Sequence, residues 1–155
     1  MLFTGQFEHT IDAKNRLAIP AEIRARWEPR RHGTTWFAVP WTGSVIRLYT
    51  ETAFGERAGA GELTLTPDED EAELQATLFG LARQLDVDAS GRIRLPEEML
   101  ELTGLGAEVV LVGAGDRLEI RDRVSWRESK AQRLAQLPDL MKRISSKRHG
   151  SPPSR

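Results

Sequence analysis

Short alternations of apolar and polar residues predict β-strands in the first part of the chain. Residues 5–11 alternate in this way, and a second short alternation follows at residues 17–19. We expect these two strands to form a hairpin around a turn at residues 12–16. Residues 36–40 and 44–49 predict a second hairpin, joined by a short turn that contains glycine.

Proline positions and a leucine stripe predict two helices in the same half. Pro20 suits the first turn of a helix over residues 21–27, which Pro29 closes. A second helix begins at a capping box formed by Thr66 and Glu69. Its leucines form one apolar stripe: Leu74, Leu78, Leu81 and Leu85. We expect this helix to pack between the two halves of the chain, with the stripe in the core.

The second half repeats the same order of elements. Residues 88–92 predict a turn, and residues 93–95 predict a short strand after it. Residues 96–102 predict a helix that ends near a glycine. Residues 108–113 and 117–121 predict the closing hairpin.

The last part of the chain predicts a basic helix. Ser125 and Glu128 form a second capping box at its start. Pro138 is expected to interrupt or kink this helix, because proline lacks the backbone donor that a helix interior needs. Residues 145–155 have the composition of a flexible tail.

A nine-residue segment occurs twice and organises the whole pattern. Residues 12–20 read Asp-Ala-Lys-Asn-Arg-Leu-Ala-Ile-Pro, and residues 88–96 read Asp-Ala-Ser-Gly-Arg-Ile-Arg-Leu-Pro, 76 positions later. An apolar residue precedes each aspartate, and a glutamate follows each proline two positions on. This match indicates a duplicated unit. Each copy alone is too small for a stable core, so we expect the halves to fold together.

The residues within the repeated turns predict their backbone. Asp12 and Asp88 can accept backbone N–H groups and so hold the turns in shape. Asn15 tolerates the left-handed conformation that such a turn needs, and Gly91 stands at the matching position of the second copy.

Charge is sorted along the chain although the total is only −1. Residues 1–60 sum to +2, residues 61–88 to −7, residues 89–122 to −3 and residues 123–155 to +7. A nucleic-acid partner is therefore compatible with the near-zero total, because local basic faces remain.

Several protein classes find no support in the sequence. The chain contains no cysteine, which excludes disulfides and thiolate metal sites. No secretory signal and no membrane-spanning run is apparent, so we expect a soluble intracellular protein. Three histidines are too scattered for a metal site: His9, His32 and His149. No phosphate-binding loop or nucleophile motif points to an enzyme, and an arginine four residues after each turn aspartate would keep it ionised. We expect no catalysis and no cofactor.

DNA binding is the function that the turns favour. An arginine fork matches guanine or phosphate with two parallel hydrogen bonds, and a narrow turn that carries Lys14 and Arg16 could enter the major groove. For one isolated turn, a simple surface ion pair between Asp12 and Arg16 is the better explanation. The duplication reverses that preference.

The complete pattern resembles the MraZ family of transcriptional regulators, which contain two SpoVT-AbrB domains. The resemblance rests on residues 8–20, residues 88–96 and residues 110–120, and it covers roughly residues 3–128. It implies a mainly β, α+β fold in which two repeats interleave as a pseudo-twofold swapped-hairpin β-barrel. The implied division of the chain is a first repeat, a linker with a helix, a second repeat, and a basic helix with a tail: residues 1–57, 58–82, 83–127 and 128–155.

The resemblance also implies partners and contact residues. Family members assemble into rings and bind G-containing direct repeats upstream of the division and cell-wall gene cluster that encodes them. Carried to this chain, the DNA contacts are Lys14 and Arg16 in the first turn and Arg92 in the second, with Arg94 nearby. The implied protein is cytoplasmic and nucleoid-associated, with double-stranded DNA as its partner, and it has no membrane or small-molecule substrate.

This chain departs from the family pattern at three places. Asn15 replaces a usual glycine, and Thr4 stands where the family often has arginine. In the second turn, Ser90 and Gly91 supply no charge. We therefore expect the first repeat to be the stronger DNA contact.

A protein-binding module remains an alternative. Antitoxins of the wider AbrB superfamily bind DNA with one part and a toxin with an extended tail, and residues 123–155 could serve as such a tail. Antitoxins typically carry one repeat, whereas this chain carries two. Copurification of a small partner would separate these hypotheses. Two interpretations of the basic tail remain equal: a flexible end in solvent, or a supporting contact to nucleic-acid phosphates. The tryptophans are interpreted as core or subunit-interface anchors: Trp27, Trp36, Trp41 and Trp126.

Overall fold

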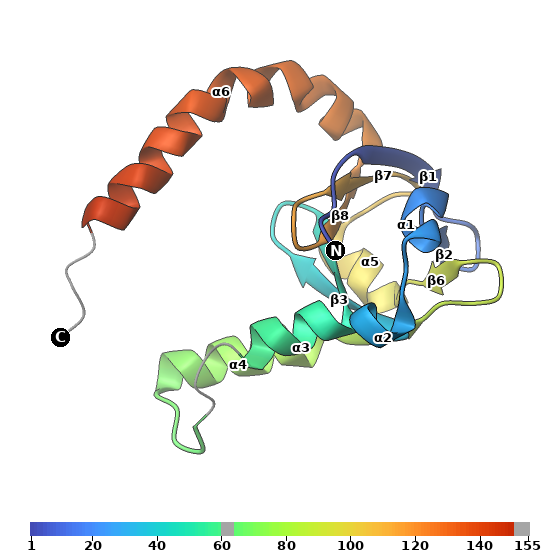
Figure 1. Cartoon of the computed structure of the whole chain (residues 1–155), viewed down its shortest axis with the longest axis horizontal. Coiled ribbons are helices and arrows are strands. Elements are labelled where there is room, and N and C mark those ends of the chain that lie inside the picture. Colours follow the sequence, from blue (N-terminus) through green and yellow to red (C-terminus); the bar gives the residue numbers. More distant parts are fainter. Residues whose placement is uncertain (60–63, 151–155) are drawn as a thin grey trace. The chain divides into compact units, whose positions relative to one another are not determined.

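The computed structural model describes residues 1–59 and 64–150, and it divides the chain into two units, Met1–Arg123 and Val124–Arg155. The strands are β1 (Gln6–Thr10), β2 (Arg16–Ala18), β3 (Thr35–Trp41), β4 (Val45–Thr50), β5 (Arg83–Asp86), β6 (Arg92–Arg94), β7 (Glu108–Gly113) and β8 (Leu118–Asp122). The helices are α1 (Ala21–Ala25), α2 (Pro29–His32), α3 (Glu51–Gly59), α4 (Glu69–Leu81), α5 (Glu97–Thr103) and α6 (Arg123–Gly150). The α+β class predicted from the sequence is confirmed (Figure 1).

The two repeats interleave in a six-stranded antiparallel sheet of order β1-β7-β8-β4-β3-β5. Strand β1 of the first repeat pairs with β7 of the second, with Phe7 opposite Leu111. In return, β5 of the second repeat pairs with β3 of the first, with Trp36 opposite Leu85. Each repeat therefore completes the hairpin of the other.

A separate two-stranded ribbon joins the repeats through β2 and β6, which lie side by side in Figure 1. Leu17 lies opposite Ile93 at its centre, and both side chains are fully buried. The N–H of Ile19 donates to the carbonyl of Gly91, and the N–H of Leu95 donates to the carbonyl of Asn15. These two bonds extend the ribbon beyond the assigned strands.

The predicted pairing of residues 5–11 with residues 17–19 was wrong. The turn between them forms, but β1 pairs with β7, and β2 pairs with β6. Alternation identifies strands without naming their partners, because it reports only which face is buried. The closed barrel implied by the family resemblance is likewise not found among the described strands, which form an open sheet and a separate ribbon.

The core fills the space between the sheet, the ribbon and the short helices. Its fully buried members include Leu17, Ile23, Ile93, Leu111 and Ile120. The rings of Trp27 and Trp36 also meet here, with centroids 4.9 Å apart. The core role expected for Trp27 and Trp36 is confirmed, whereas Trp41 is 41% exposed.

Helices in the first half are shorter and more numerous than predicted. Helix α1 ends at Ala25, and Pro29 begins α2 instead of closing α1. Proline suits this place because the first position of a helix needs no backbone donor. Helix α3 was not predicted at all. It follows β4 directly, and the Thr50 hydroxyl accepts the N–H of Ala53 at its start.

Helix α4 differs from its prediction at both ends. Asp68 is its N-cap and accepts the N–H of Glu71 at 2.8 Å, so Thr66 does not cap it. The helix ends at Leu81, and Leu85 belongs to β5. Leu85 is buried in the core, but the three leucines on α4 are not, and Leu74 is 61% exposed.

Helix α6 is longer than predicted at both ends. It begins at Arg123, so Ser125 lies inside its first turn rather than ahead of it. The helix continues through Pro138 and reaches Gly150, which replaces most of the predicted tail, while residues 151–155 lie outside the described part of the chain. Across the described residues, no helix combines the length and the apolar character that crossing a membrane requires.

Candidate nucleic-acid interface

The first turn is held by Asp12 through its backbone and its side chain. The carbonyl of Asp12 accepts the N–H of Asn15 at 2.9 Å, and its own N–H donates to the carbonyl of Arg16 at 3.0 Å. One carboxylate oxygen accepts the N–H groups of Lys14 and Arg16 at 2.9 and 2.8 Å. The other accepts Nε of Arg16 at 2.7 Å. The aspartate therefore fixes both the loop and the arginine.

The second turn repeats this arrangement around Asp88. Its carbonyl accepts the N–H of Gly91 at 3.0 Å. One carboxylate oxygen accepts the N–H groups of Ser90 and Arg92 at 2.9 and 3.0 Å, and the other accepts Nε of Arg92 at 3.1 Å. Asn15 and Gly91 have φ angles of 62° and 79°, the left-handed conformation expected from the sequence. The two turns thus share one hydrogen-bonding pattern.

Both turn aspartates are held in the ionised form. The backbone N–H of Arg16 is the main cause that lowers the pKa of Asp12, and the Arg16 side chain lowers it further. The backbone N–H of Arg92 lowers the pKa of Asp88 in the same way, and the N–H of Ser90 adds to the effect. Each turn therefore carries a negative charge that orients its arginine at neutral pH.

The ribbon brings all four predicted DNA-contacting residues together. Arg16 lies opposite Arg94 in the register of β2 and β6. Nε of Arg94 donates to the carbonyl of Lys14 at 3.1 Å, so a side chain from the second repeat braces the first turn. A terminal nitrogen of Arg92 lies 3.9 Å from the Asp12 carboxylate. The two turns therefore form one cationic cluster instead of two separate ones.

Arg24 is a fifth cation at this cluster that the sequence did not indicate. Its Nε donates to the carbonyl of Ile19 at 3.1 Å. Its guanidinium also lies over Gly91, where an added Cβ would come within 2.5 Å of an Arg24 nitrogen. The matching residue of the second repeat is Leu100, so no repeated pattern marks Arg24. Gly91 is therefore needed for close approach as well as for its positive φ.

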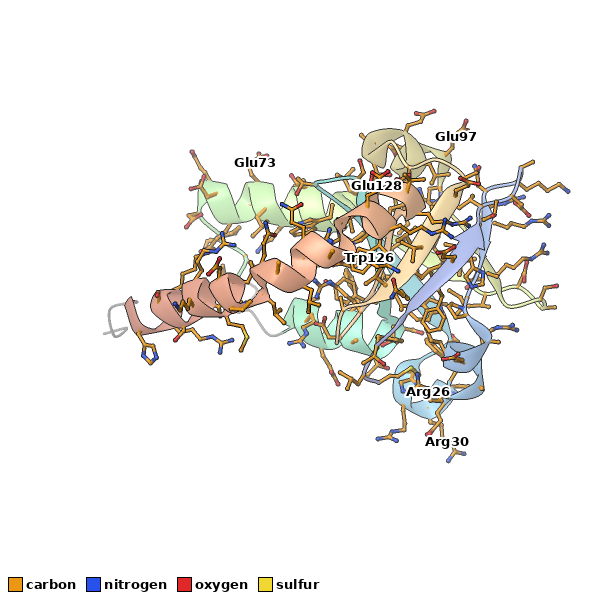
Figure 2. All side chains as sticks on the ribbon, turned by 90° about the horizontal axis from the view of Figure 1, so that it is seen from above. Arg26, Arg30, Glu73, Glu97, Trp126 and Glu128 are labelled. Atoms are coloured by element: carbon orange, nitrogen blue, oxygen red, sulfur yellow. The ribbon has the colours of Figure 1, made fainter. Side chains whose placement is uncertain are left out.

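The helices that follow the two turns have opposite charge. In the first repeat, Arg26 and Arg30 lie on the segment formed by α1 and α2 (Figure 2). In the second, the corresponding helix α5 carries Glu97 at its start, with Glu98 beside it. A polyanion at the ribbon would therefore meet more favourable charge on the side of the first repeat. In the described part of the chain, no group of three metal-ligating side chains is found.

The chain contains two repeats whose strands interleave, and each repeat carries one turn in which an aspartate binds an arginine. These features define a class of two-repeat α+β protein built around a cationic ribbon. The family model described as "MraZ protein, putative antitoxin-like" matches residues 78–143. The chain is 30% identical over 145 residues to the transcriptional regulator MraZ of Bordetella pertussis. The aligned residues cover 93% of this chain and 99% of that protein. The chain belongs to the MraZ family.

Other relatives agree with this assignment. The transcriptional regulator MraZ of Coxiella burnetii is 29% identical over 135 residues, which cover 87% of this chain and 89% of that protein. The protein of the same name from Mesoplasma florum is 30% identical over 127 residues, covering 81% and 84%. The family membership predicted from the repeated turns is therefore confirmed. These relatives are named as regulators and not as enzymes.

Proposed function

We propose that this chain is a transcriptional regulator that binds specific DNA sequences through the ribbon formed by β2 and β6. The observation that carries this proposal is the pair of turns with the same hydrogen-bonding pattern, each of which holds an arginine through Nε to an aspartate. If these ion pairs only stabilised the turns, the two turns would not need to share one ribbon. They do share it, and Arg94 of the second repeat contacts Lys14 of the first.

The chemistry of the cluster suits a guanine-containing site. The aspartate of each turn binds Nε of its arginine. This leaves both terminal nitrogens of Arg16, and the Arg92 terminal nitrogen that does not face Asp12, to address O6 and N7 of guanine. The side chains of Arg16 and Arg92 are 30% and 33% exposed, which is enough for contact while their stems stay fixed. A two-stranded ribbon is also narrow enough to enter the major groove.

The first repeat is proposed as the stronger contact. Lys14 is exposed in its turn, whereas Ser90 holds the same place in the second. Arg24 approaches from α1, while α5 begins with Glu97 and Glu98. Asn15 keeps the turn geometry without the usual glycine, so this departure from the family costs little.

A homo-oligomer that contacts several sites completes the proposal. One ribbon offers few phosphate contacts, and the linkage of several copies raises the effective concentration at repeated sites. We infer a ring on direct repeats in the promoter of its own division and cell-wall gene cluster, on the nucleoid. The interleaved pairing supports a swapped-hairpin arrangement of two SpoVT-AbrB repeats, at residues 1–57 and 83–127, with residues 58–82 as linker and residues 128–155 as the basic end.

Fluorescence anisotropy with DNA from upstream of the gene and with scrambled DNA tests the proposal. The wild type should prefer the upstream DNA, and Arg16→Ala should remove most of that preference, with a smaller loss for Arg92→Ala. Arg31→Ala is the matched control, because its exposed arginine lies on α2, outside the ribbon. It should weaken both DNAs alike. Equal binding of both DNAs by the wild type would refute the proposal.

A further inference from the structure

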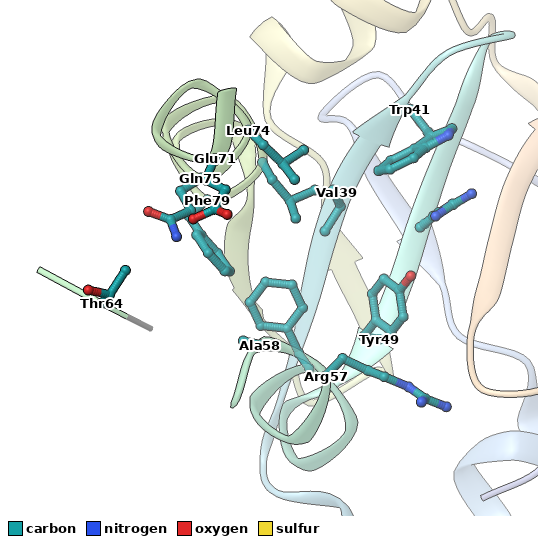
Figure 3. A pocket seen from close by; sticks show the side chains of 13 residues that line it. Val39, Trp41, Tyr49, Arg57, Ala58, Thr64, Glu71, Leu74, Gln75 and Phe79 are labelled. Atoms are coloured by element: carbon teal, nitrogen blue, oxygen red, sulfur yellow. The ribbon is translucent and has the colours of Figure 1, made fainter. Parts of the chain in front are cut away.

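An apolar groove lies between strands β3 and β4 and helices α3 and α4 (Figure 3). It has a volume of about 650 Å³. Side chains from all four elements line it, among them Trp41, Tyr49, Phe54, Leu74 and Phe79. The groove is remote in sequence from the turns, and the proposed DNA contacts make no use of it.

Helix α4, one wall of this groove, exposes apolar surface that its own unit does not cover. Leu74 is 61% exposed, and Phe79 and Leu81 are 39% and 37% exposed. Its aromatic contact with α3 is a single edge-on approach of Phe79 to Phe54, with ring centroids 6.2 Å apart. A helix with this much exposed apolar surface is typical of an interface.

One wall of the groove, helix α4, is acidic. Helix α4 carries Glu69, Asp70, Glu71 and Glu73 and no basic residue. The two arginines that line the groove are paired: Arg57 lies 3.0 Å from Asp116, and Arg47 lies 3.7 Å from Glu119. The carboxylates of α4 therefore present negative charge to a partner at this wall of the groove.

Helix α6 has the complementary properties. Four of its exposed apolar side chains recur at spacings of three, four and three and form one stripe: Leu134, Leu137, Met141 and Ile144. This stripe rises about 15 Å along the axis, within the roughly 20 Å length of α4. Residues 123–155 sum to +7, against −7 for residues 61–88.

We propose that the groove binds the apolar stripe of α6 from a second copy of the chain. This inference rests on the homo-oligomer proposed above. The occupant is a helix that lays a local apolar stripe into a groove, and opposite charges fix its place. Because each copy carries one groove and one stripe, the same contact can join successive copies into a closed ring.

The absence of cysteine from the chain allows a direct test by disulfide cross-linking. Full-length Leu74→Cys protein is mixed with tagged Leu137→Cys protein, and both are oxidised at low and high salt. A mixed dimer should be the main product at low salt and should decrease as salt screens the charges. Leu102→Cys is the control partner for the groove variant, because Leu102 is 59% exposed and belongs to α5, not to the stripe.

Three outcomes would overturn the inference. In the first, the mixed dimer is no more abundant than the dimer formed with the Leu102→Cys control. In the second, the yield of mixed dimer does not change with salt. The third is a Leu74→Cys/Leu137→Cys chain that cross-links only within itself. If cross-linking fails but the wild type still prefers its upstream DNA, this inference falls and the proposed function stands. If cross-linking succeeds without any DNA preference, the reverse holds.

Discussion

Asn15 and Gly91 place two arginines in equivalent settings because both residues adopt a left-handed backbone. Their φ angles are 62° and 79°. Asparagine reaches this conformation at a small cost, and glycine reaches it freely. The aspartate three positions before Asn15 or Gly91 then closes the turn and aligns the side chain of the following arginine. The specificity of the proposed contact therefore begins with backbone conformation.

Gly91→Ala should destabilise the protein by about 1–3 kcal/mol, because alanine is strained at positive φ. The new methyl group would also displace Arg24. Urea unfolding of Gly91→Ala, Arg24→Ala and the double variant separates the two causes. The double variant should be less destabilised than the sum of the single variants, since it removes the steric contact. Strict additivity would show that Arg24 does not press on the turn.

Asp88→Asn should alter the pH dependence of stability. The folded-state pKa of Asp88 lies below the ordinary 3.8, so its contribution is present above that pH and is lost as the pH falls through the folded-state value. The variant lacks this contribution. The difference between wild type and variant in free energy of unfolding should therefore shrink as the pH falls through the ordinary 3.8 and then through the lower folded-state pKa. A difference that stays constant in urea titrations would contradict this account.

At the residue scale, the sequence predicted the turns well and their surroundings poorly. Asp12 and Asp88 could be assigned because their hydrogen bonds are local and their pattern is repeated. Arg24 could not, because its role depends on the approach of α1 to a turn 67 positions away in sequence. A single sequence predicts hydrogen bonds within a short segment, whereas it does not predict contacts between distant segments.

At the element scale, the sequence predicted every strand except β5, and it predicted pairings only for strands that are adjacent in the chain. The hairpins β3–β4 and β7–β8 match their sequence patterns, because the two strands of each are adjacent in the chain. Strand β1 instead pairs with β7, about a hundred positions away. For helix α4, the helix was predicted but its burial was not. Leucines at helical spacing predicted a buried stripe, although the spacing shows only that they share one side of the helix.

Asp68→Ala should destabilise the start of α4 by about 1 kcal/mol, since the carboxylate caps the N–H of Glu71. Amide hydrogen exchange within α4 should become roughly fivefold faster. Thr66→Ala is the matched control and should have little effect, because Thr66 lies outside the helix. The opposite order of effects would restore the cap that the sequence suggested.

At the scale of the whole molecule, interleaving joins the two repeats into one folded unit. The exchange of β1 and β5 makes each repeat part of the core of the other, so the ribbon at the centre has a fixed register. That register sets Arg16 opposite Arg94. The spacing of the arginines in the proposed DNA-binding surface therefore follows from the fold and not from either turn alone.

Charge sorting acts at the same scale. The near-zero total conceals basic residues at the ribbon, an acidic α4 and a basic α6. The first suits a polyanion, and the other two suit each other in an oligomer. The sequence predicted this separation of charge, but the groove became apparent only when α3 and α4 were placed against the sheet.

The most direct test of the central claim is the DNA preference of Arg16→Lys. Lysine keeps the positive charge but lacks the fork that makes paired hydrogen bonds to guanine. Anisotropy titrations over a range of salt should give a salt dependence close to that of the wild type. The preference for upstream over scrambled DNA should fall by about 1–3 kcal/mol, which is roughly fivefold to 150-fold. If Arg16→Lys keeps the full preference, the turn contributes charge alone and the account of sequence reading is wrong.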